Sequence, residues 1–136
     1  MANREVFVDT HAFYCVMSRN DRQHDRAKSL LQSMTAVPVT TDWIVGETVN
    51  LLTARRKHHV AMRFLDYLDA SDGLRIVHVD AARFDRAREL IRVHREHEFP
   101  FTDCTSFVVM KEFGMHDVLT NDRHFRIMGF NPLLAD

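Results

Sequence analysis

Short runs of β-branched and aromatic residues alternate with longer amphipathic segments along the whole sequence, and this alternation limits the fold more than any other feature. The β-prone runs predict strands at residues 5–8, 37–40, 74–79 and 118–120, with a further edge strand in the segment MGFNPLL. The segments between them predict helices at residues 10–17, 21–34, 42–54, 59–68 and 80–97, one from Thr102 or Asp103 to Gly114, and a short one after Asp122. Such an alternation predicts a parallel sheet with helices on both faces. Right-handed crossovers bring the carboxyl ends of its strands to one edge, where ligands bind.

Size and composition fit one globular domain. The sequence has 136 residues, of which 46% are hydrophobic and 27% charged, and we expect a single domain over residues 1–136. The longest apolar run covers residues 12–17, far short of the roughly 20 residues of a membrane span, and MANREVFVD lacks the apolar core of a signal peptide. Two cysteines are too few for a disulfide scaffold or a cysteine-based zinc module. These features predict a cytoplasmic protein that does not enter a membrane.

Four acidic residues occupy positions that the expected fold brings together. Asp9 closes the first strand and Asp122 follows the fourth, so both should lie at the same edge of the sheet. Asp103 lies at the start of a helix. Glu47 lies in the helix DWIVGETVNLLTA. Apolar side chains cover nearly the whole circumference of this helix, so we expect the helix to be buried. A buried carboxylate is costly unless it is paired or bound to metal.

Carboxylates that converge on one cleft repel one another unless a divalent cation neutralises them. Oxygen ligands alone suit Mg²⁺ or Mn²⁺, and such a site activates water for phosphodiester hydrolysis. Each acid also has a separate structural explanation. Asp103, Asp122 and Asp9 are placed where they could cap a helix, and the explanation is weakest for Glu47, because a buried carboxylate there needs a partner that its helix does not supply. One shared site accounts for all four acids more simply than four separate roles do.

Four segments carry a family resemblance. FVDTHAFY, the helix with Glu47 followed by Asn50, Leu51 and Leu52, FTDCTSF and VLTNDRHF resemble the ordered motifs of PIN-domain ribonucleases, and more narrowly those of VapC-type toxins. The resemblance covers essentially the whole chain. It implies a three-layer α/β/α fold with a central parallel sheet of four to five strands in the order 3-2-1-4-5. It also implies Mg²⁺- or Mn²⁺-dependent cleavage of RNA that leaves 3′-hydroxyl and 5′-phosphate ends.

The resemblance also implies roles for individual residues and for partners. Asp9 and Asp103 would bind the metal ion, while Glu47 and Asp122 would act through water or on a second ion. A small antitoxin would hold the toxin inactive with its C-terminal segment in the cleft, and two copies of the chain would form a homodimer.

Three neighbouring positions complete the comparison with the family. Thr10 and Thr120 match hydroxyl positions beside the acids. His11 stands where many members carry a small residue, and packing or capping is favoured for it over substrate contact.

Two other functions are weighed against the nuclease. A phosphatase with Asp9 as its nucleophile usually needs a second aspartate two residues on, where His11 stands. A catalytically inert binding protein of the same fold would not need all four acids. The sequence contains neither GxGxxG nor GxxxxGK[ST], so a nucleotide cofactor is not implied.

The net charge of −1 excludes RNA binding by bulk charge, so any RNA contact must come from local basic clusters. The segment ARRKHHVAMR contains Arg55, Arg56 and Lys57 and no acid, and these cations would hold RNA phosphates. The alternative is that they only favour the dipole at a helix C-terminus. Arg123 and Arg126, close to Asp122, are further candidates.

Overall fold

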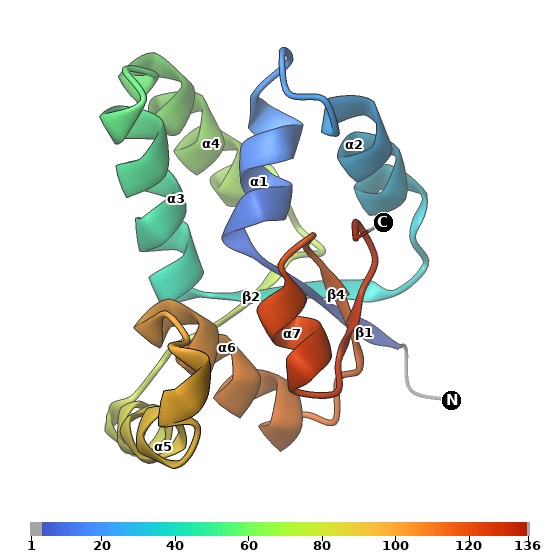
Figure 1. The fold of residues 1–136 in the computed structure, drawn as a ribbon. Coiled ribbons are helices and arrows are strands. Elements are labelled where there is room, and N and C mark those ends of the chain that lie inside the picture. The colour runs from blue at the N-terminus through green and yellow to red at the C-terminus, as the bar shows by residue number, and fades with distance from the viewer. Residues whose placement is uncertain (1–3, 136) are drawn as a thin grey trace.

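A computed structural model describes residues 4–135 and places a parallel sheet at the centre of the molecule (Figure 1). Its strands are β1 (Glu5–Val8), β2 (Val37–Thr41), β3 (Arg75–Val77), β4 (Asp117–Leu119) and β5 (Asn131–Pro132). They are all parallel and lie in the order β3-β2-β1-β4-β5. The predicted strand order is therefore confirmed, although β3 is shorter than the predicted 74–79 strand.

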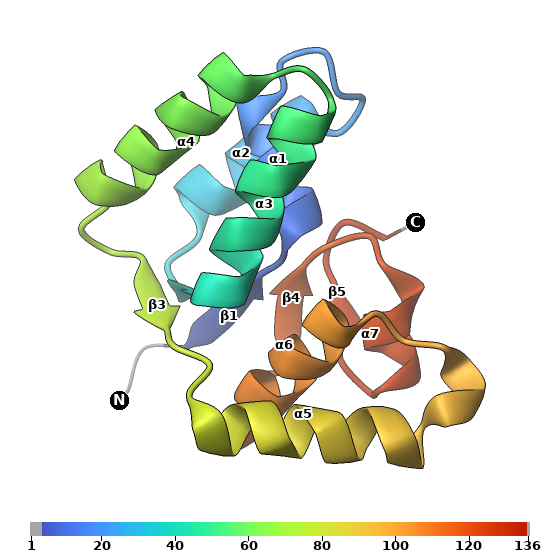
Figure 2. The ribbon, with the colours of Figure 1, turned by 90° about the vertical axis from the view of Figure 1, so that its left-hand side faces the viewer.

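Helices cover the sheet in two groups. They are α1 (Thr10–Met17), α2 (His24–Ser33), α3 (Asp42–Ala54), α4 (His58–Ala70), α5 (Ala81–Val93), α6 (Phe101–Glu112) and α7 (Arg123–Ile127). Helices α1–α4 gather on one side of the strands and α5–α7 on the other, as both views show (Figures 1 and 2). This arrangement confirms the predicted three-layer fold. Within residues 4–135 no helix combines the length and the apolar character that a membrane crossing requires.

The core is built around β1 and α6. Val6, Phe7 and Val8 of β1 are each at most 1% exposed, because β1 is a central strand and helices cover both faces of the sheet. Every residue of α6 from Asp103 to Met110 is buried. The Phe107 ring of α6 lies 4.9 Å from the Phe125 ring, centroid to centroid. Asp103 is thereby fixed to one of the most deeply packed helices of the molecule.

Several predicted helix limits were wrong, and α4 extends beyond the predicted 59–68 at both ends. Helix α2 begins at His24 and not at Asp21, because the Asp21 carboxylate accepts a hydrogen bond from the Gln23 amide at 2.8 Å and forms a turn. Helix α5 ends at Val93, and residues 95–97 form a separate 3₁₀ turn. Helix α6 begins at Phe101, one residue before the earlier of its two predicted starts.

Other predicted helix ends are confirmed. The Thr41 hydroxyl caps α3 by accepting from the Ile44 amide at 3.1 Å. The Asp80 carboxylate caps α5. Gly114, with a φ of 66°, ends α6 in a left-handed conformation, and the following Met115 amide donates back to the Met110 carbonyl at 2.9 Å.

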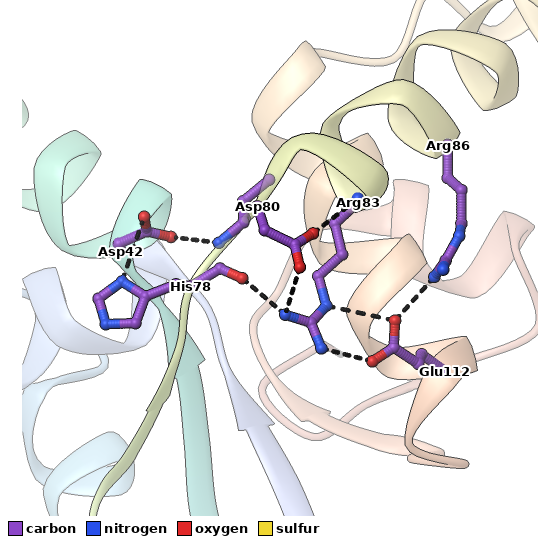
Figure 3. A network of polar contacts seen from close by, with 7 residues as sticks. Asp42, His78, Asp80, Arg83, Arg86 and Glu112 are labelled. Carbon is purple, nitrogen blue, oxygen red and sulfur yellow. Dashed lines mark hydrogen bonds and ion pairs between the residues drawn. The ribbon is translucent and has the colours of Figure 1, made fainter.

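A network of ion pairs ties α3, α5 and α6 together (Figure 3). The Arg83 guanidinium donates to Glu112 Oε2 at 2.6 Å and to Oε1 at 3.2 Å, and Arg86 donates to Oε1 at 2.7 Å. At the other end of the network, Asp42 accepts from the Val79 amide at 2.9 Å. The first turn of α3 is therefore anchored to the segment that leads into α5.

Candidate functional site

All four predicted acids line one cavity of about 500 Å³ at the carboxyl edge of the sheet. Asp9 directly follows β1, and Asp122 follows β4, the strand beside it. Asp103 reaches the cavity from α6 and Glu47 reaches it from α3. The parallel sheet thus brings together acids that are spread over most of the sequence.

Thr120 holds the two acids at the strand ends in place. Its hydroxyl donates to Asp9 Oδ2 at 2.8 Å, and its oxygen accepts from the Asp122 amide at 3.1 Å. The Asp9 amide donates to the Leu119 carbonyl at 3.2 Å. Asp9 is only 5% exposed and forms no side-chain cap on α1, so the capping explanation does not apply to it.

Asp103 and Asp122 meet at His124, which the sequence analysis missed. The His124 Nδ1 lies 3.0 Å from Asp103 Oδ2 and 3.1 Å from Asp122 Oδ1. Asp122 also caps α7 by accepting from the His124 amide at 2.9 Å, so its predicted cap and site positions coexist. Asp103 does not cap α6, because Pro100 occupies the N-cap position. The sequence feature that could have identified His124 as a site residue is its position in the first turn of a helix that starts after the candidate acid Asp122.

Glu47 is less buried than predicted. On α3 only Ile44, Thr48 and Leu52 are buried, and the other large apolar side chains of this helix are half-buried. The helix therefore lies against the core along one stripe, and Glu47 is half-buried where it lines the cavity. Its Oε1 accepts from the Thr10 hydroxyl at 2.7 Å. Both predicted hydroxyl groups thus contact an acid of the cavity.

Burial and neighbouring negative charges raise the pKa values of Asp9 and Asp103. Burial raises the pKa of Asp9 to about 7, against the lowering effect of the Thr120 hydrogen bond. Burial, followed by the negative charges of Asp9 and Asp122, raises the pKa of Asp103 well above its ordinary value. Within residues 4–135, no Lys or Arg side chain forms an ion pair with any of the four acids.

The donor set of the cavity fits a divalent cation. Ligand atoms of Asp103, Asp122 and His124 lie within 4.8 Å of one another, and Asp9 and Glu47 line the same cavity. A cation among these carboxylates would replace the missing counter-charge. Oxygen donors of this kind are those that hard divalent cations prefer.

The predicted basic segment does not act as one strip. Arg55 lines the cavity, and its guanidinium lies 4.6 Å from the centre of the Tyr14 ring. The Lys57 ammonium donates to Ser18 Oγ at 2.8 Å and to the Tyr14 hydroxyl at 3.3 Å. Arg56 is exposed and has a positive φ of 61°. Of the three cations, Arg55 is the one placed to meet a ligand in the cavity.

A second, smaller cavity of about 240 Å³ adjoins the first and is strongly basic. Arg22, Arg123 and Arg126 line it, and Asn121 lines both cavities. Arg123 and Arg126 are predicted candidates for RNA contact, whereas Arg22, about a hundred residues away in the sequence, was not predicted. This basic cavity places three guanidinium groups beside the acids.

His11 contacts neighbouring side chains, and the preference for packing over substrate contact stays a prediction. Its Nε2 lies 2.7 Å from the Gln23 Oε1 and 3.5 Å from the Cys15 sulfur. The ring also borders the cavity that holds the acids. The hydrogen bond to Gln23 joins α1 to the start of α2.

Comparison with known proteins agrees with this geometry. The model of the PIN domain family matches residues 6–131. The chain is 34% identical over 125 residues to the 23S rRNA-specific endonuclease VapC20 of Mycobacterium tuberculosis, and the match covers 92% of this chain and 95% of that protein.

Solved structures give the same result. The crystal structure of Mycobacterium tuberculosis VapC20, described as a Sarcin-Ricin loop cleaving toxin, matches with a TM-score of 0.85 and 33% identity, over 92% of this chain and 95% of that one. VapBC2 from Rickettsia felis, bound to a DNA fragment from its promoter, matches with a TM-score of 0.66 and 13% identity, over 94% and 96%. A toxin–antitoxin complex from Klebsiella pneumoniae matches with a TM-score of 0.59 and 14% identity, over 87% of each chain. The last two similarities concern the fold alone.

Proposed function

The chain belongs to the PIN-domain family, and on this premise we propose that it is a metal-dependent RNA endonuclease of the VapC type that acts as the toxin of a toxin–antitoxin pair. The observation that carries the proposal is the convergence of Asp9, Glu47, Asp103 and Asp122 on one cavity. Raised carboxylate pKa values without a paired Lys or Arg are typical of a site built for a ligand.

The cation in this proposal is Mg²⁺ or Mn²⁺. Asp9 and Asp103 would hold it directly, and Glu47 and Asp122 would act through water or on a second ion. Such a cation supplies an activated water molecule and withdraws charge from a phosphoryl oxygen. His124 keeps the carboxylates of Asp103 and Asp122 in one orientation.

The side chains of the chain position the reacting groups. Thr120 orients Asp9, and Thr10 orients Glu47, each through one hydroxyl hydrogen bond. Arg55 binds a phosphate of the RNA strand at the cavity, and Arg123 binds one at the neighbouring basic cavity. In the reaction, a water oxygen bonds to phosphorus while the bond from phosphorus to the 3′ oxygen breaks. The products are a 3′-hydroxyl and a 5′-phosphate.

The proposed partners follow from the same reading. RNA is the substrate, and a cognate antitoxin holds the protein inactive; solved relatives include a toxin–antitoxin complex. We also propose a homodimer and a cytoplasmic location, where the RNA substrate is available. The phosphatase alternative has no support at Asp9, because the side chain two residues on is a histidine bonded to Gln23.

Cleavage by the antitoxin-free protein tests the proposal. The purified chain is incubated with 23S rRNA and with total RNA, in Mg²⁺, in Mn²⁺ or in EDTA, and the new ends are mapped by primer extension. We expect discrete cuts that require the metal. An absence of cleavage in both metals would favour the inert binding protein instead.

A thermal unfolding series tests the metal separately from activity. A cation at a hundred times its Kd stabilises the fold by about 2.7 kcal/mol. We expect the melting temperature to rise with Mg²⁺ or Mn²⁺ in the native chain and to rise less in Asp9→Asn.

A further inference from the structure

A groove beside the acids is not used by the proposed mechanism. It has a volume of about 410 Å³ and is lined by Trp43, Gly46, Glu47, Asn50 and Thr102. The α3 members are spaced at three, four and seven residues, so they lie on one face of the helix. Glu47 also lines the acid cavity, and Thr102 directly precedes Asp103. The groove therefore adjoins the cavity of the acids, with Glu47 as a shared lining residue.

Trp43 is held in a fixed position in this groove. Its ring lies 5.3 Å from the Phe101 ring and 6.2 Å from the Phe84 ring, centroid to centroid. The preceding residue, Asp42, accepts from the Val79 amide at 2.9 Å and lies 3.5 Å from His78 Nδ1, and these contacts hold the first turn of α3 (Figure 3). A supported aromatic ring of this kind is ready to bind a ligand without further ordering.

Gly46 leaves the groove open. A Cβ atom at this position would meet no atom within 4 Å, and its φ is not in the left-handed region. Neither close packing nor backbone conformation therefore requires glycine here. Glycine inside a helix is nevertheless less stable than alanine. A ligand in the groove would explain why the position has no side chain.

We propose that this groove binds one nucleobase of the RNA, next to the phosphodiester that is cleaved; this inference rests on the proposed endonuclease function. The base stacks on the Trp43 ring, and its edge forms hydrogen bonds with the Asn50 amide and the Thr102 hydroxyl. Aromatic stacking combined with polar contacts to base edges is how proteins recognise single-stranded RNA. Asn50 is exposed and offers both a donor and an acceptor for this purpose.

Filling the groove is the first test. Gly46→Leu places a large side chain on an exposed part of the helix, where it is expected to leave the fold intact. Losing a base–aromatic contact weakens RNA binding by roughly 5- to 160-fold. We expect KM for a cleaved RNA to rise by that factor, with kcat changed less than about twofold because the acids are untouched. An unchanged KM in a folded Gly46→Leu variant would overturn the proposal.

Gly73→Leu is the matched control. Gly73 also has open space around its Cβ position and no positive φ, but it precedes β3 and so lies at the opposite edge of the sheet. We expect its KM to equal that of the native chain. Trp43→Phe should retain most of the affinity that Trp43→Ala loses, because phenylalanine also stacks; equal losses in the two variants would argue against stacking.

The single tryptophan makes binding directly visible. In the Asp103→Asn variant, with Mg²⁺ present, a mixed-sequence RNA 12-mer should quench Trp43 fluorescence and an abasic 12-mer should not. Equal quenching by both, or quenching by the antitoxin but not by RNA, would overturn the nucleobase assignment. If the native chain cleaves RNA and Gly46→Leu has an unchanged KM, the groove proposal fails while the nuclease proposal stands. A native chain that cleaves no RNA refutes the nuclease, whereas base-dependent quenching would still support the groove.

Discussion

The two ends of α6 carry carboxylates in opposite electrostatic states. Glu112, in the last turn, accepts hydrogen bonds from Arg83 and Arg86, and these bonds lower its pKa. Asp103, in the first turn, is buried beside other acids, and its pKa is raised. The helix dipole alone would favour the charged form of Asp103 and disfavour that of Glu112. Burial and neighbouring charges therefore outweigh the dipole at both ends.

The difference separates charges that serve the fold from charges that serve a ligand. Glu112 and its arginines join α5 to α6 and are complete within the chain (Figure 3). The negative charges of Asp9 and Asp122 repel that of Asp103, so a bound cation would stabilise the charged form of these carboxylates. Each of the following predictions tests this separation, from the largest expected effect to the smallest.

Removing one charge from each end of α6 should have very different effects on catalysis. Asp103→Asn keeps the side-chain volume and removes a proposed metal ligand. This change forfeits several kcal/mol of charge stabilisation, or about a thousandfold in rate. Glu112→Gln should change the initial rate of RNA cleavage less than about twofold. Full activity of Asp103→Asn at matched Mg²⁺ would remove Asp103 from the site.

The pH dependence of stability should also differ. Without metal, a carboxyl whose pKa is raised in the folded state stabilises the fold at low pH and loses this effect as pH rises through the folded pKa. For Asp9, with a pKa of about 7, the free energy of unfolding should fall between pH 4 and 7 by up to about 1.4 kcal/mol per pH unit. Urea unfolding in EDTA measures this slope.

The control for the pH series is the other carboxylate. Asp9→Asn should reduce the fall between pH 4 and 7, and the raised pKa of Asp103 should account for the part that remains. Glu112→Gln should leave it in place, because the pKa of Glu112 is lowered and its contribution is lost only as pH falls through that lower value. An identical slope in all three proteins would show that Asp9 does not titrate in this range.

At neutral pH, the stability of the fold should depend on Glu112 and not on an acid of the cavity. Glu112→Gln weakens charge-assisted hydrogen bonds to two arginines in a partly exposed site and should destabilise the fold by about 1–2 kcal/mol. Glu47→Gln should leave the metal-free protein equally or more stable because it relieves repulsion, while weakening stabilisation by Mg²⁺. Thermal unfolding with and without Mg²⁺ compares the two; a large loss in metal-free Glu47→Gln would show that Glu47 has a structural role.

The smallest expected effect is on the salt dependence of RNA binding, and it should distinguish Arg55 from Lys57. Arg55 lines the acid cavity, whereas the Lys57 ammonium is bonded to Ser18 and Tyr14. Arg55→Gln should reduce the slope of log affinity against log salt concentration by about 0.7–0.9. Lys57→Gln should leave that slope unchanged. Equal slopes in native and Arg55→Gln protein would exclude a phosphate contact at Arg55.

The strands of the sheet and the convergence of the acids could be predicted from the sequence, because both depend on local patterns. Strand-like runs end at Asp9 and just before Asp122, and parallel topology then fixes where those acids meet. His124 and Arg22 were missed because their roles arise only from packing. His124 meets Asp103 across two elements, and Arg22 meets Arg123 at a cavity between distant segments.

Burial along α3 could not be predicted for a related reason. Its composition is apolar on nearly all sides, which usually indicates a buried helix. The structure buries only Ile44, Thr48 and Leu52 and leaves the side of Trp43 and Asn50 beside a groove. Composition cannot distinguish an apolar side chain that packs in the core from one that borders a groove.

The adjacency of β1 and β4 in the sheet has a consequence for how the protein is made. Asp9 and Asp122 are 113 positions apart in the sequence, and translation at about 5–20 residues per second separates their synthesis by roughly 6–23 seconds. A nascent chain that ends before β4 contains Asp9, Glu47 and Asp103 but cannot place Thr120 against Asp9. The order of synthesis thus delays assembly of the acidic site until β4, Thr120 and Asp122 have been made, well after Asp9, Glu47 and Asp103.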